Sequence, residues 1–242
     1  MLYLNKQYFN VNGRIYLIPV TLGGNDFLKV IPEKVISLTR LLRFFIVEDI
    51  RSARRFLRLI DREFPIDDTV FFELNEHTGD TDIAYYLEPI MKGSDIGVMS
   101  EAGLPGIADP GARIIALAHQ KKITVTPLSG PSSIILALIS SGLNGQNFTF
   151  NGYLPIKPAE RSAKIRELEK KAGDGCAQIF METPYRNQKL LETLTTTCNN
   201  DTKLCIAADI TLPTESIRTM SISEWKRDLP SLNDKLVVFV MQ

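Results

Sequence analysis

Apolar and polar positions alternate along the first half of the chain with two recurring periods. Short β-branched or aromatic runs predict strands, and the stretches between them repeat every three to four residues, as an amphipathic helix does. Strands are expected at 14–19, 44–48, 69–73, 95–99 and 123–127, and helices at 32–42, 51–63, 80–91 and 110–121. This alternation favours a mainly parallel sheet covered by helices.

The pattern changes after Pro127. Helices are expected at 131–141, 160–172 and 185–197, and strands at 147–153, 176–182, 203–210, 215–221 and 235–241. The last three strands have only a short helix between them, and closely spaced strands favour antiparallel pairing. We therefore expect two α/β domains, residues 1–127 with a mainly parallel sheet and residues 128–242 with a mixed sheet.

Composition and charge narrow the class of protein. The 242 residues include 28 basic and 28 acidic side chains, so the formal net charge is zero. A protein that coats nucleic acid is usually basic overall, although a local basic patch remains possible here. The three cysteines, Cys176, Cys198 and Cys205, are not spaced as a zinc site or a redox pair, which predicts reduced thiols, no metal and a cytoplasmic protein.

Residues 123–156 contain no charged side chain and no histidine. Their longest purely apolar run, Ile134–Ile139, is far shorter than the roughly 20 residues of a membrane span. We expect this stretch to be buried where the two domains meet, and we expect no membrane association.

Two loops at the ends of predicted strands suit a ligand, because ligands of open α/β sheets bind beyond the carboxyl ends of the strands. The loop Ser100–Gly111 is longer than the usual 2–6 residues of such a connection, and its small residues allow close backbone approach. Asp109 suits the cap of the following helix and Pro110 its first position. The segment Ser129–Ser133 begins another helix, whose free N–H groups would bind polar ligand atoms or simply be capped.

Common phosphate and nucleophile motifs are missing. No G-x-G-x-x-G follows the first strand, no G-x-x-x-x-G-K-[ST] occurs, and no G-x-S-x-G elbow occurs. A standard dinucleotide site, a P-loop NTPase and an α/β-hydrolase are therefore disfavoured.

At the two loops the sequence resembles the tetrapyrrole-methylase superfamily of S-adenosylmethionine-dependent methyltransferases. It is most similar to the bacterial small-subunit rRNA cytidine ribose 2′-O-methyltransferases, over residues 14–241. The matching pieces occur in the family's order and are Pro19 with Leu22-Gly23-Gly24-Asn25, Glu48-Asp49-x-Arg51, Asn75-Glu76, Ser100-Glu101-Ala102-Gly103-x-Pro105, Asp109-Pro110-Gly111, Gly130-Pro131-Ser132, Gly152-Tyr153-Leu154-Pro155 and Glu182-Thr183-Pro184-x-Arg186.

The resemblance implies two α/β domains with the ligand cleft between them, and a homodimer. The cofactor would be S-adenosylmethionine, which leaves as S-adenosylhomocysteine. Its contacts would fall on small or apolar residues of both domains, namely Pro19, Ser100, Ala102, Gly103, Ile107, Ala108, Gly130, Ser132, Ser133, Met181, Ala207 and Ala208. Ile50, Ser52, Leu74 and Leu104 stand where the subfamily usually carries Thr, His, His and Thr, so the departures lie mostly on the expected substrate side.

A ribose hydroxyl is a poor nucleophile, so a nearby carboxylate would help as general base. The candidates at predicted strand ends are Glu48, Asp49, Glu76 and Glu101. If the strand continues, Glu48 and Asp49 face opposite ways, so one of them would reach the cleft and either one could instead cap the following helix.

The helix after Glu48-Asp49 carries a second signal. From residue 40 to 62 there are seven arginines and three acidic residues, and Arg51, Arg54, Arg55 and Arg58 lie at helical spacing. The planar guanidinium suits phosphate, which would make this face an RNA contact, although a charge run is also typical of an ordinary solvated helix.

Three functions therefore compete. The first is methylation of ribosomal RNA within the small ribosomal subunit. The second keeps the enzyme and changes the acceptor to a tetrapyrrole or another small molecule, as the departures at Ile50, Ser52, Leu74 and Leu104 suggest. The third is a catalytically inactive module that binds S-adenosylmethionine.

Overall fold

The computed structural model describes residues 13–75 and 77–242, and the chain divides into two compact units. Unit 1 extends to Pro131, and unit 2 runs from Ser132 to Gln242. Gly130 explains why the connecting segment belongs to unit 1, because a Cβ built on it would lie 2.1 Å from Cβ of Pro19.

Unit 1 contains a five-stranded sheet in the order β3-β2-β4-β1-β5, with every pair parallel. The strands are β1 (Ile15–Leu17), β2 (Phe44–Val47), β3 (Val70–Glu73), β4 (Ile96–Met99) and β5 (Val125–Pro127). The helices are α1 (Glu33–Leu41), α2 (Ile50–Ile60), α3 (Asp80–Tyr85), α4 (Glu88–Met91) and α5 (Gly111–Gln120). The expected parallel sheet is confirmed.

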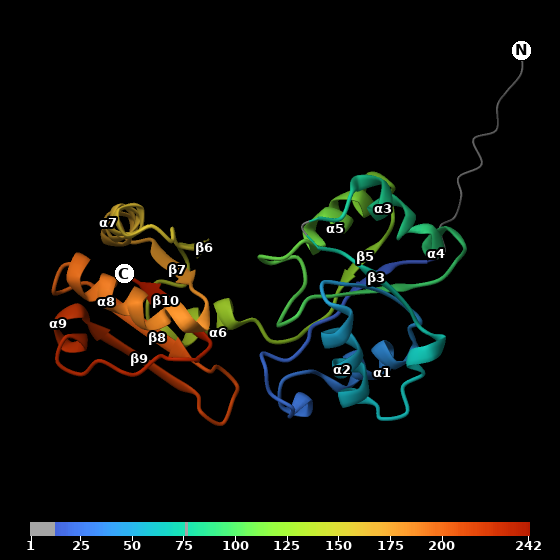
Figure 1. Cartoon of the computed structure of the whole chain (residues 1–242), viewed down its shortest axis with the longest axis horizontal. Coiled ribbons are helices and arrows are strands. Elements are labelled where there is room, and N and C mark those ends of the chain that lie inside the picture. The colour runs from blue at the N-terminus through green and yellow to red at the C-terminus, as the bar shows by residue number, and fades with distance from the viewer. Residues whose placement is uncertain (1–12, 76) are drawn as a thin grey trace, which may run out of the picture. The chain divides into compact units, whose positions relative to one another are not determined.

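Helices cover both faces of this sheet (Figure 1). On one face, α1 and α2 pack their buried side chains against Ile18, Phe45 and Val47. On the other face, α3, α4 and α5 pack against Ile15 and Ile46. Because neighbouring residues of a strand point to opposite faces, the near-continuous apolar runs of β2 and β4 supply both cores.

One expected helix is divided in two. The pattern predicts a single helix over 80–91, but α3 ends at Tyr85 and α4 starts at Glu88. Pro89 is the reason, because its ring would clash with the carbonyl four residues earlier in a continuous helix and it has no N–H to donate. Here Pro89 occupies the first turn of α4, where neither problem arises.

Unit 2 contains a mixed five-stranded sheet in the order β6-β7-β10-β8-β9. The strands are β6 (Phe148–Tyr153), β7 (Ala177–Met181), β8 (Lys203–Ala208), β9 (Ser216–Ser221) and β10 (Val237–Met241), and the helices are α6 (Ser133–Ser141), α7 (Pro158–Gly173), α8 (Asn187–Thr197) and α9 (Ile222–Trp225). β6 and β7 are parallel, whereas the other pairs are antiparallel. The predicted mixed sheet is confirmed.

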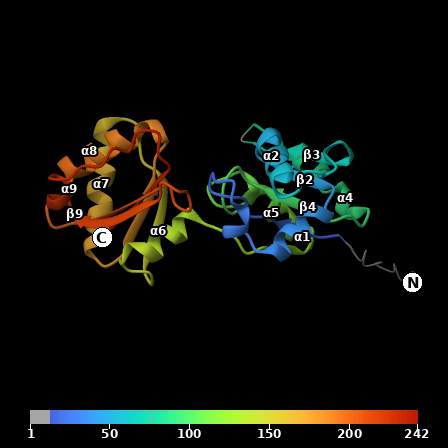
Figure 2. The same ribbon diagram turned by 90° about the horizontal axis from the view of Figure 1, so that it is seen from below.

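The two faces of the second sheet are covered unequally. Side chains of α7, α8 and α9 surround Phe180, Phe239 and Trp225 in one core. The helix α6 packs on β8, β9 and β10 and supplies no residue to that core, so it lies on the opposite face (Figure 2). Its C-terminal residue is followed by Gly142 with a φ of 70°, the left-handed conformation that ends many helices.

The charge-free stretch 123–156 is not the buried centre that we expected. Ile135, Ile139, Phe148, Tyr153 and Ile156 are all exposed. Lack of charge in a sequence therefore does not ensure burial, because a surface that meets a partner can also be uncharged. Within the part of the chain that the structure describes, no helix is long and apolar enough to cross a membrane.

Candidate functional site

Three connections meet at the carboxyl edge of the sheet in unit 1. The backbone N–H of Val20, after β1, donates to the carbonyl of Gly103, after β4, at 2.9 Å. Gly130, after β5, packs directly on the ring of Pro19. A Cβ on Gly103 would lie 3.4 Å from the carbonyl oxygen of Pro131. The structure thus brings together the two loops identified in the sequence, with Pro19 between them.

The loop after β4 keeps small or apolar residues at its surface. Ala102, Ile107 and Ala108 are exposed, and Ser100 Oγ donates to the carbonyl of Ala102 at 3.2 Å. Gly103 has a φ of 71°, Gly106 a φ of 87° and Ala108 a φ of 60°, so three residues of the loop adopt the left-handed conformation. The segment from Ala102 to Ala108 thus presents backbone groups to a ligand and carries no charged side chain.

Asp109 is not the cap that the sequence suggested. The helix α5 begins at Gly111, Pro110 takes the cap position, and no side chain caps it. Instead, both carboxylate oxygens of Asp109 accept from the N–H of Gly106, at 2.8 and 3.0 Å, and Oδ1 also accepts from the N–H of Gly111 at 2.6 Å. The Asp109 side chain therefore binds backbone groups of its own loop, and its charge lies at the carboxyl edge of the sheet.

Glu48 and Asp109 line one small hollow of about 10 Å³, together with apolar residues that include Leu74 and Met99. Burial raises the pKa of Glu48 above its usual range, and the nearby charges of Glu101, Asp109 and Asp49 raise it further. Burial also raises the pKa of Asp109, against the N–H groups that it accepts from. Two partly desolvated carboxylates in one hollow are typical of sites that move protons.

The neighbouring carboxylates have different tasks. Asp49 caps α2, since its Oδ1 accepts from the N–H of Ser52 at 2.7 Å, and this contact lowers the pKa of Asp49. Glu101 donates its backbone N–H to Oε2 of Glu48 at 3.3 Å and accepts from the hydroxyl of Ser52 at 3.4 Å. Of the pair at the end of β2, Glu48 is thus the one that faces the hollow. Glu76 lies outside the described residues.

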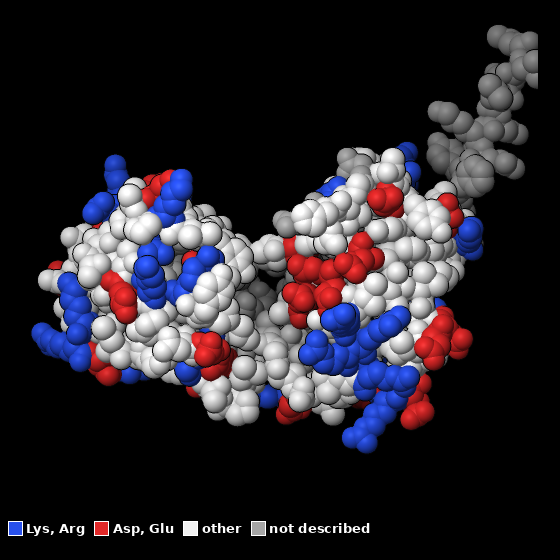
Figure 3. Space-filling view, in the orientation of Figure 1, with Lys and Arg blue, Asp and Glu red and all other residues white. Residues whose placement is uncertain are grey.

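The arginines of α2 form an exposed face. Arg51, Arg54, Arg55 and Arg58 all point to solvent, while Ala53, Phe56, Leu57 and Ile60 are buried beneath them. The guanidinium of Arg54 lies over the ring of Phe71, with its carbon 5.3 Å from the ring centroid. Figure 3 shows this basic patch directly beside a group of acidic side chains on the visible face of unit 1.

In unit 2, the register of the strands shows which of the expected donor contacts share a face of the sheet. Met181 pairs with Val238, and Val238 pairs with Ala207 on its other side, so these three side chains share one face. Ala208 belongs to the core on the opposite face. The sequence gives no reason to prefer one of the two alanines as a donor contact, and the structure places only Ala207 on the face of Met181.

The helix α6 starts near the same edge of that sheet. Asn144, just after α6, donates to the carbonyl of Gly175 at 2.8 Å, which places the end of α6 beside the start of β7. The start of α6, with Ser132 and Ser133, therefore lies toward the end of β7, where Met181 is. Ser132 caps the helix by accepting from the N–H of Ile135 at 3.4 Å, as the simpler interpretation of this segment predicted.

Reasoning from sequence missed one residue of the acidic hollow. Asp109 stands before Pro110-Gly111, a pattern that indicates a helix start, and nothing in the sequence places it beside Glu48. Among the described residues, no group of three or more His, Cys, Asp or Glu side chains is arranged to hold a metal. The hollow presents the carboxylates of Glu48 and Asp109, and the small residues of the loop beside it leave backbone groups accessible.

Comparisons with known proteins identify the family. A sequence model of the family described as Tetrapyrrole (Corrin/Porphyrin) Methylases matches residues 34–226. The ribosomal RNA small subunit methyltransferase I of Vibrio cholerae is 29% identical over 220 residues, which cover 91% of this chain and 73% of that protein. Its namesake from Streptococcus pyogenes serotype M3 is 30% identical and covers 88% and 70%.

Solved structures share the fold at lower identity. The methyltransferase CobJ superposes with a TM-score of 0.61 at 16% identity, over 95% of this chain and 93% of that chain. The cobalt precorrin-4 methyltransferase CbiF superposes with a TM-score of 0.58 at 14% identity, over 95% of each chain. At such identities the likeness concerns the fold alone.

Proposed function

This chain belongs to the tetrapyrrole methylase family and is a methyltransferase that uses S-adenosylmethionine, and from this premise we propose that it methylates a ribose hydroxyl of ribosomal RNA in the small ribosomal subunit. The observation that carries the proposal is the acidic hollow of unit 1 beside the arginine face of α2. The hollow supplies a base for the ribose hydroxyl, and the arginine face supplies cations for the phosphates of RNA.

The residues around the carboxyl edges fit the donor. Pro19, Ser100, Ala102, Gly103, Ile107, Ala108 and Gly130 in unit 1, and Ser132, Ser133, Met181 and Ala207 in unit 2, are the residues that we propose hold it. Their side chains are uncharged, and the turns at Gly103 and Ala108 leave room for close approach of the backbone. When bound, the donor supplies a methyl group already activated on a sulfonium, so the protein mainly has to align the acceptor.

Glu48 is the proposed general base. Its carboxylate would accept the proton of the ribose hydroxyl, and the raised pKa brings its basicity closer to that of the group it serves. Burial is the main cause of that raised pKa, the backbone N–H of Glu101 opposes it, and the charges of Glu101 and Asp109 add to it. Arg51, Arg54, Arg55 and Arg58 would bind phosphates on either side of the target nucleotide.

We further propose that the protein acts in the cytoplasm as a homodimer, and that the exposed apolar side chains of α6, Ile135 and Ile139, meet the second copy. Sedimentation of the wild type and of Ile139→Lys tests this part, because a charge in a dimer contact should shift the protein toward the monomer.

The function is tested with small ribosomal subunits from cells that lack the enzyme. Incubation with tritiated S-adenosylmethionine should label the RNA, and nuclease digestion should release the label as a 2′-O-methylated nucleotide. Subunits that already carry the modification are the control and should take up no label. If donor binding is intact but no label enters RNA, the proposed substrate is wrong.

A further inference from the structure

Two tyrosines stand exposed at the carboxyl edge of the sheet in unit 2. Tyr153, the last residue of β6, is 56% exposed, and Tyr185, just after β7, is 73% exposed. Neither ring takes part in the function proposed above. Tyrosine combines a large apolar ring with a polar tip, and it is enriched where proteins meet partners.

A bulge in β6 directs Tyr153 to the face of Met181. Phe150 pairs with Ile179 and Tyr153 pairs with Met181, so β6 takes three steps where β7 takes two. Gly152 supplies the left-handed turn, with a φ of 64° and open space around it. Without the extra residue, Tyr153 would point to the opposite face, because side chains alternate along a strand.

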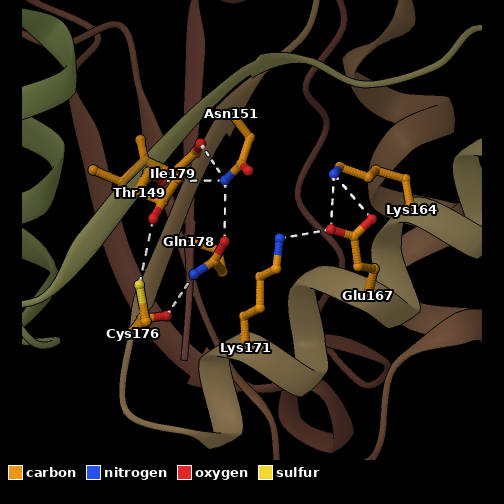
Figure 4. Close-up of polar contacts among 8 residues, drawn as sticks. All are labelled: Thr149, Asn151, Lys164, Glu167, Lys171, Cys176, Gln178 and Ile179. Atoms are coloured by element: carbon orange, nitrogen blue, oxygen red, sulfur yellow. Dashed lines mark hydrogen bonds and ion pairs between the residues drawn. The ribbon is translucent and has the colours of Figure 1, made fainter.

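Polar contacts hold this bulge in place. The side-chain amide of Asn151 donates to the carbonyl of Thr149 at 3.1 Å, to Oε1 of Gln178 at 3.2 Å and to the carbonyl of Ile179 at 3.3 Å (Figure 4). Gln178 is fully buried and donates in turn to the carbonyl of Cys176 at 2.8 Å. The bulge that orients Tyr153 is therefore held by hydrogen bonds of Asn151 and Gln178, which join β6 to β7.

A fixed cation accompanies the second ring. The guanidinium carbon of Arg186 lies 5.2 Å from the ring centroid of Tyr185, and Arg186 Nη2 donates to Oε1 of Glu182 at 2.6 Å. The Glu182 side chain is fully buried and is held by the N–H of Thr183 at 2.8 Å. Tyr153 pairs with Met181, the last residue of β7, and Tyr185 follows in the next turn of the chain, so both tyrosines lie at the carboxyl end of β7.

We propose that Tyr153 and Tyr185, with Arg186, form a stacking surface for unpaired bases of single-stranded RNA. This inference rests on the proposed function and names a contact within it. Aromatic rings beside a cation bind single-stranded RNA, because splayed bases offer flat faces and the backbone offers negative charge. The bases would lie next to Met181, an expected donor contact that shares the register position of Tyr153.

The experiment measures binding of a fluorescein-labelled, unstructured pyrimidine 12-mer RNA to the full chain. Tyr153→Ala and Tyr185→Ala should each weaken binding by about 5- to 150-fold, since the flat faces are lost. Tyr153→Phe and Tyr185→Phe keep the rings and should bind within about twofold of the wild type. Tyr85→Ala in unit 1, a tyrosine that is 58% exposed, is the matched control and should have no effect.

Calorimetric titration with S-adenosylmethionine, carried out on the same variants, should show unchanged donor affinity. The inference is overturned if the alanine variants bind the 12-mer as the wild type does, or if they lose donor affinity to the same degree. It is also overturned if sedimentation shows that they dissociate a dimer while RNA binding is retained.

A second measurement needs no variant. Irradiation of the wild type with a 12-mer that carries 5-bromouridine should crosslink Tyr153 or Tyr185, as identified by mass spectrometry of the peptides. Crosslinks confined to other residues would contradict the proposal. If small subunits take up no label while the alanine variants still lose the 12-mer, the methylation of ribosomal RNA fails and the stacking surface stands.

Discussion

The two units use the same edge of a five-stranded sheet in chemically opposite ways. In unit 1, the ends of β2 and β4 carry Glu48 and Glu101, and the helix beside them carries arginines. In unit 2, the ends of β6, β7 and β8 carry Tyr153, Met181 and Ala207 in one row. One architecture thus carries charged side chains at one sheet edge, where we propose proton transfer and phosphate binding, and uncharged ones at the other, where we propose flat or apolar contacts.

The largest effect should come from removing the charge of Glu48. Glu48→Gln keeps the shape but cannot accept a proton, so kcat for RNA methylation should fall by about 10²- to 10⁴-fold. Donor affinity, measured by calorimetry, should not change. Asp49→Asn is the matched control one residue away, because asparagine caps a helix as well as aspartate does. If Asp49→Asn loses as much kcat as Glu48→Gln, the roles of general base and helix cap are not divided between these two carboxylates.

The next effect concerns the small residues between the loops of unit 1. Gly130→Ala places a methyl group 2.1 Å from Cβ of Pro19, so the backbone of one loop has to move. Overpacking of this kind costs about 1–3 kcal/mol, and donor affinity should fall by at least about tenfold. Gly145→Ala, where nothing lies within 4 Å of the added methyl, is the control for calorimetry and for thermal unfolding. Unchanged donor affinity in Gly130→Ala would place the donor elsewhere.

A smaller effect should follow from reversing charge on α2. Arg54→Glu with Arg58→Glu should raise KM for small subunits by about tenfold and reduce the salt dependence of RNA binding, because fewer phosphates are neutralised. Arg166→Glu with Lys170→Glu, both exposed on α7, carries the same charge change in unit 2 and should matter less. If the α2 variant instead methylates RNA normally, its arginines are an ordinary solvated face, and an acceptor without phosphate becomes the better explanation.

The smallest effect should be on stability, and it has opposite signs at adjacent carboxylates. Because the pKa of Glu48 is raised from 4.5, its contribution to stability is present below about pH 4.5 and is lost as pH rises through the raised pKa. Because the pKa of Asp49 is lowered from 3.8, its contribution is present above that value and is lost as pH falls through the lowered pKa.

Near pH 7, Glu48→Gln should therefore melt slightly above the wild type and Asp49→Ala below it. Thermal unfolding followed from pH 4 to pH 8 measures both. The gap between Glu48→Gln and the wild type should close toward acid pH. A gap that does not depend on pH would mean that Glu48 is not desolvated by its hollow.

Much of the fold was readable before the structure. Every expected strand and helix is present within a few residues, and the one division follows from Pro89, whose effect on a helix is itself local. Hydrophobic period and turn residues are local properties, and they sufficed for the elements and for the parallel and mixed sheets. The arginine face of α2 was equally local, since its buried and exposed sides alternate with the helical period.

Other features needed the third dimension. The sequence does not contain the strand order β3-β2-β4-β1-β5, and that order alone brings the end of β2 next to the end of β4, so that Glu48 meets Glu101 and Asp109. Register decided that Ala207 rather than Ala208 shares the face of Met181. The bulge at Gly152 decided where Tyr153 points.

The elements, the two sheets and the two loops follow from residues close together in the chain, and the amino-acid sequence therefore predicts them. Which carboxylate caps a helix and which has a raised pKa depends on burial and on neighbours 50 or more residues away, as the contact from the N–H of Glu101 to Glu48 shows, and only the folded chain supplies these.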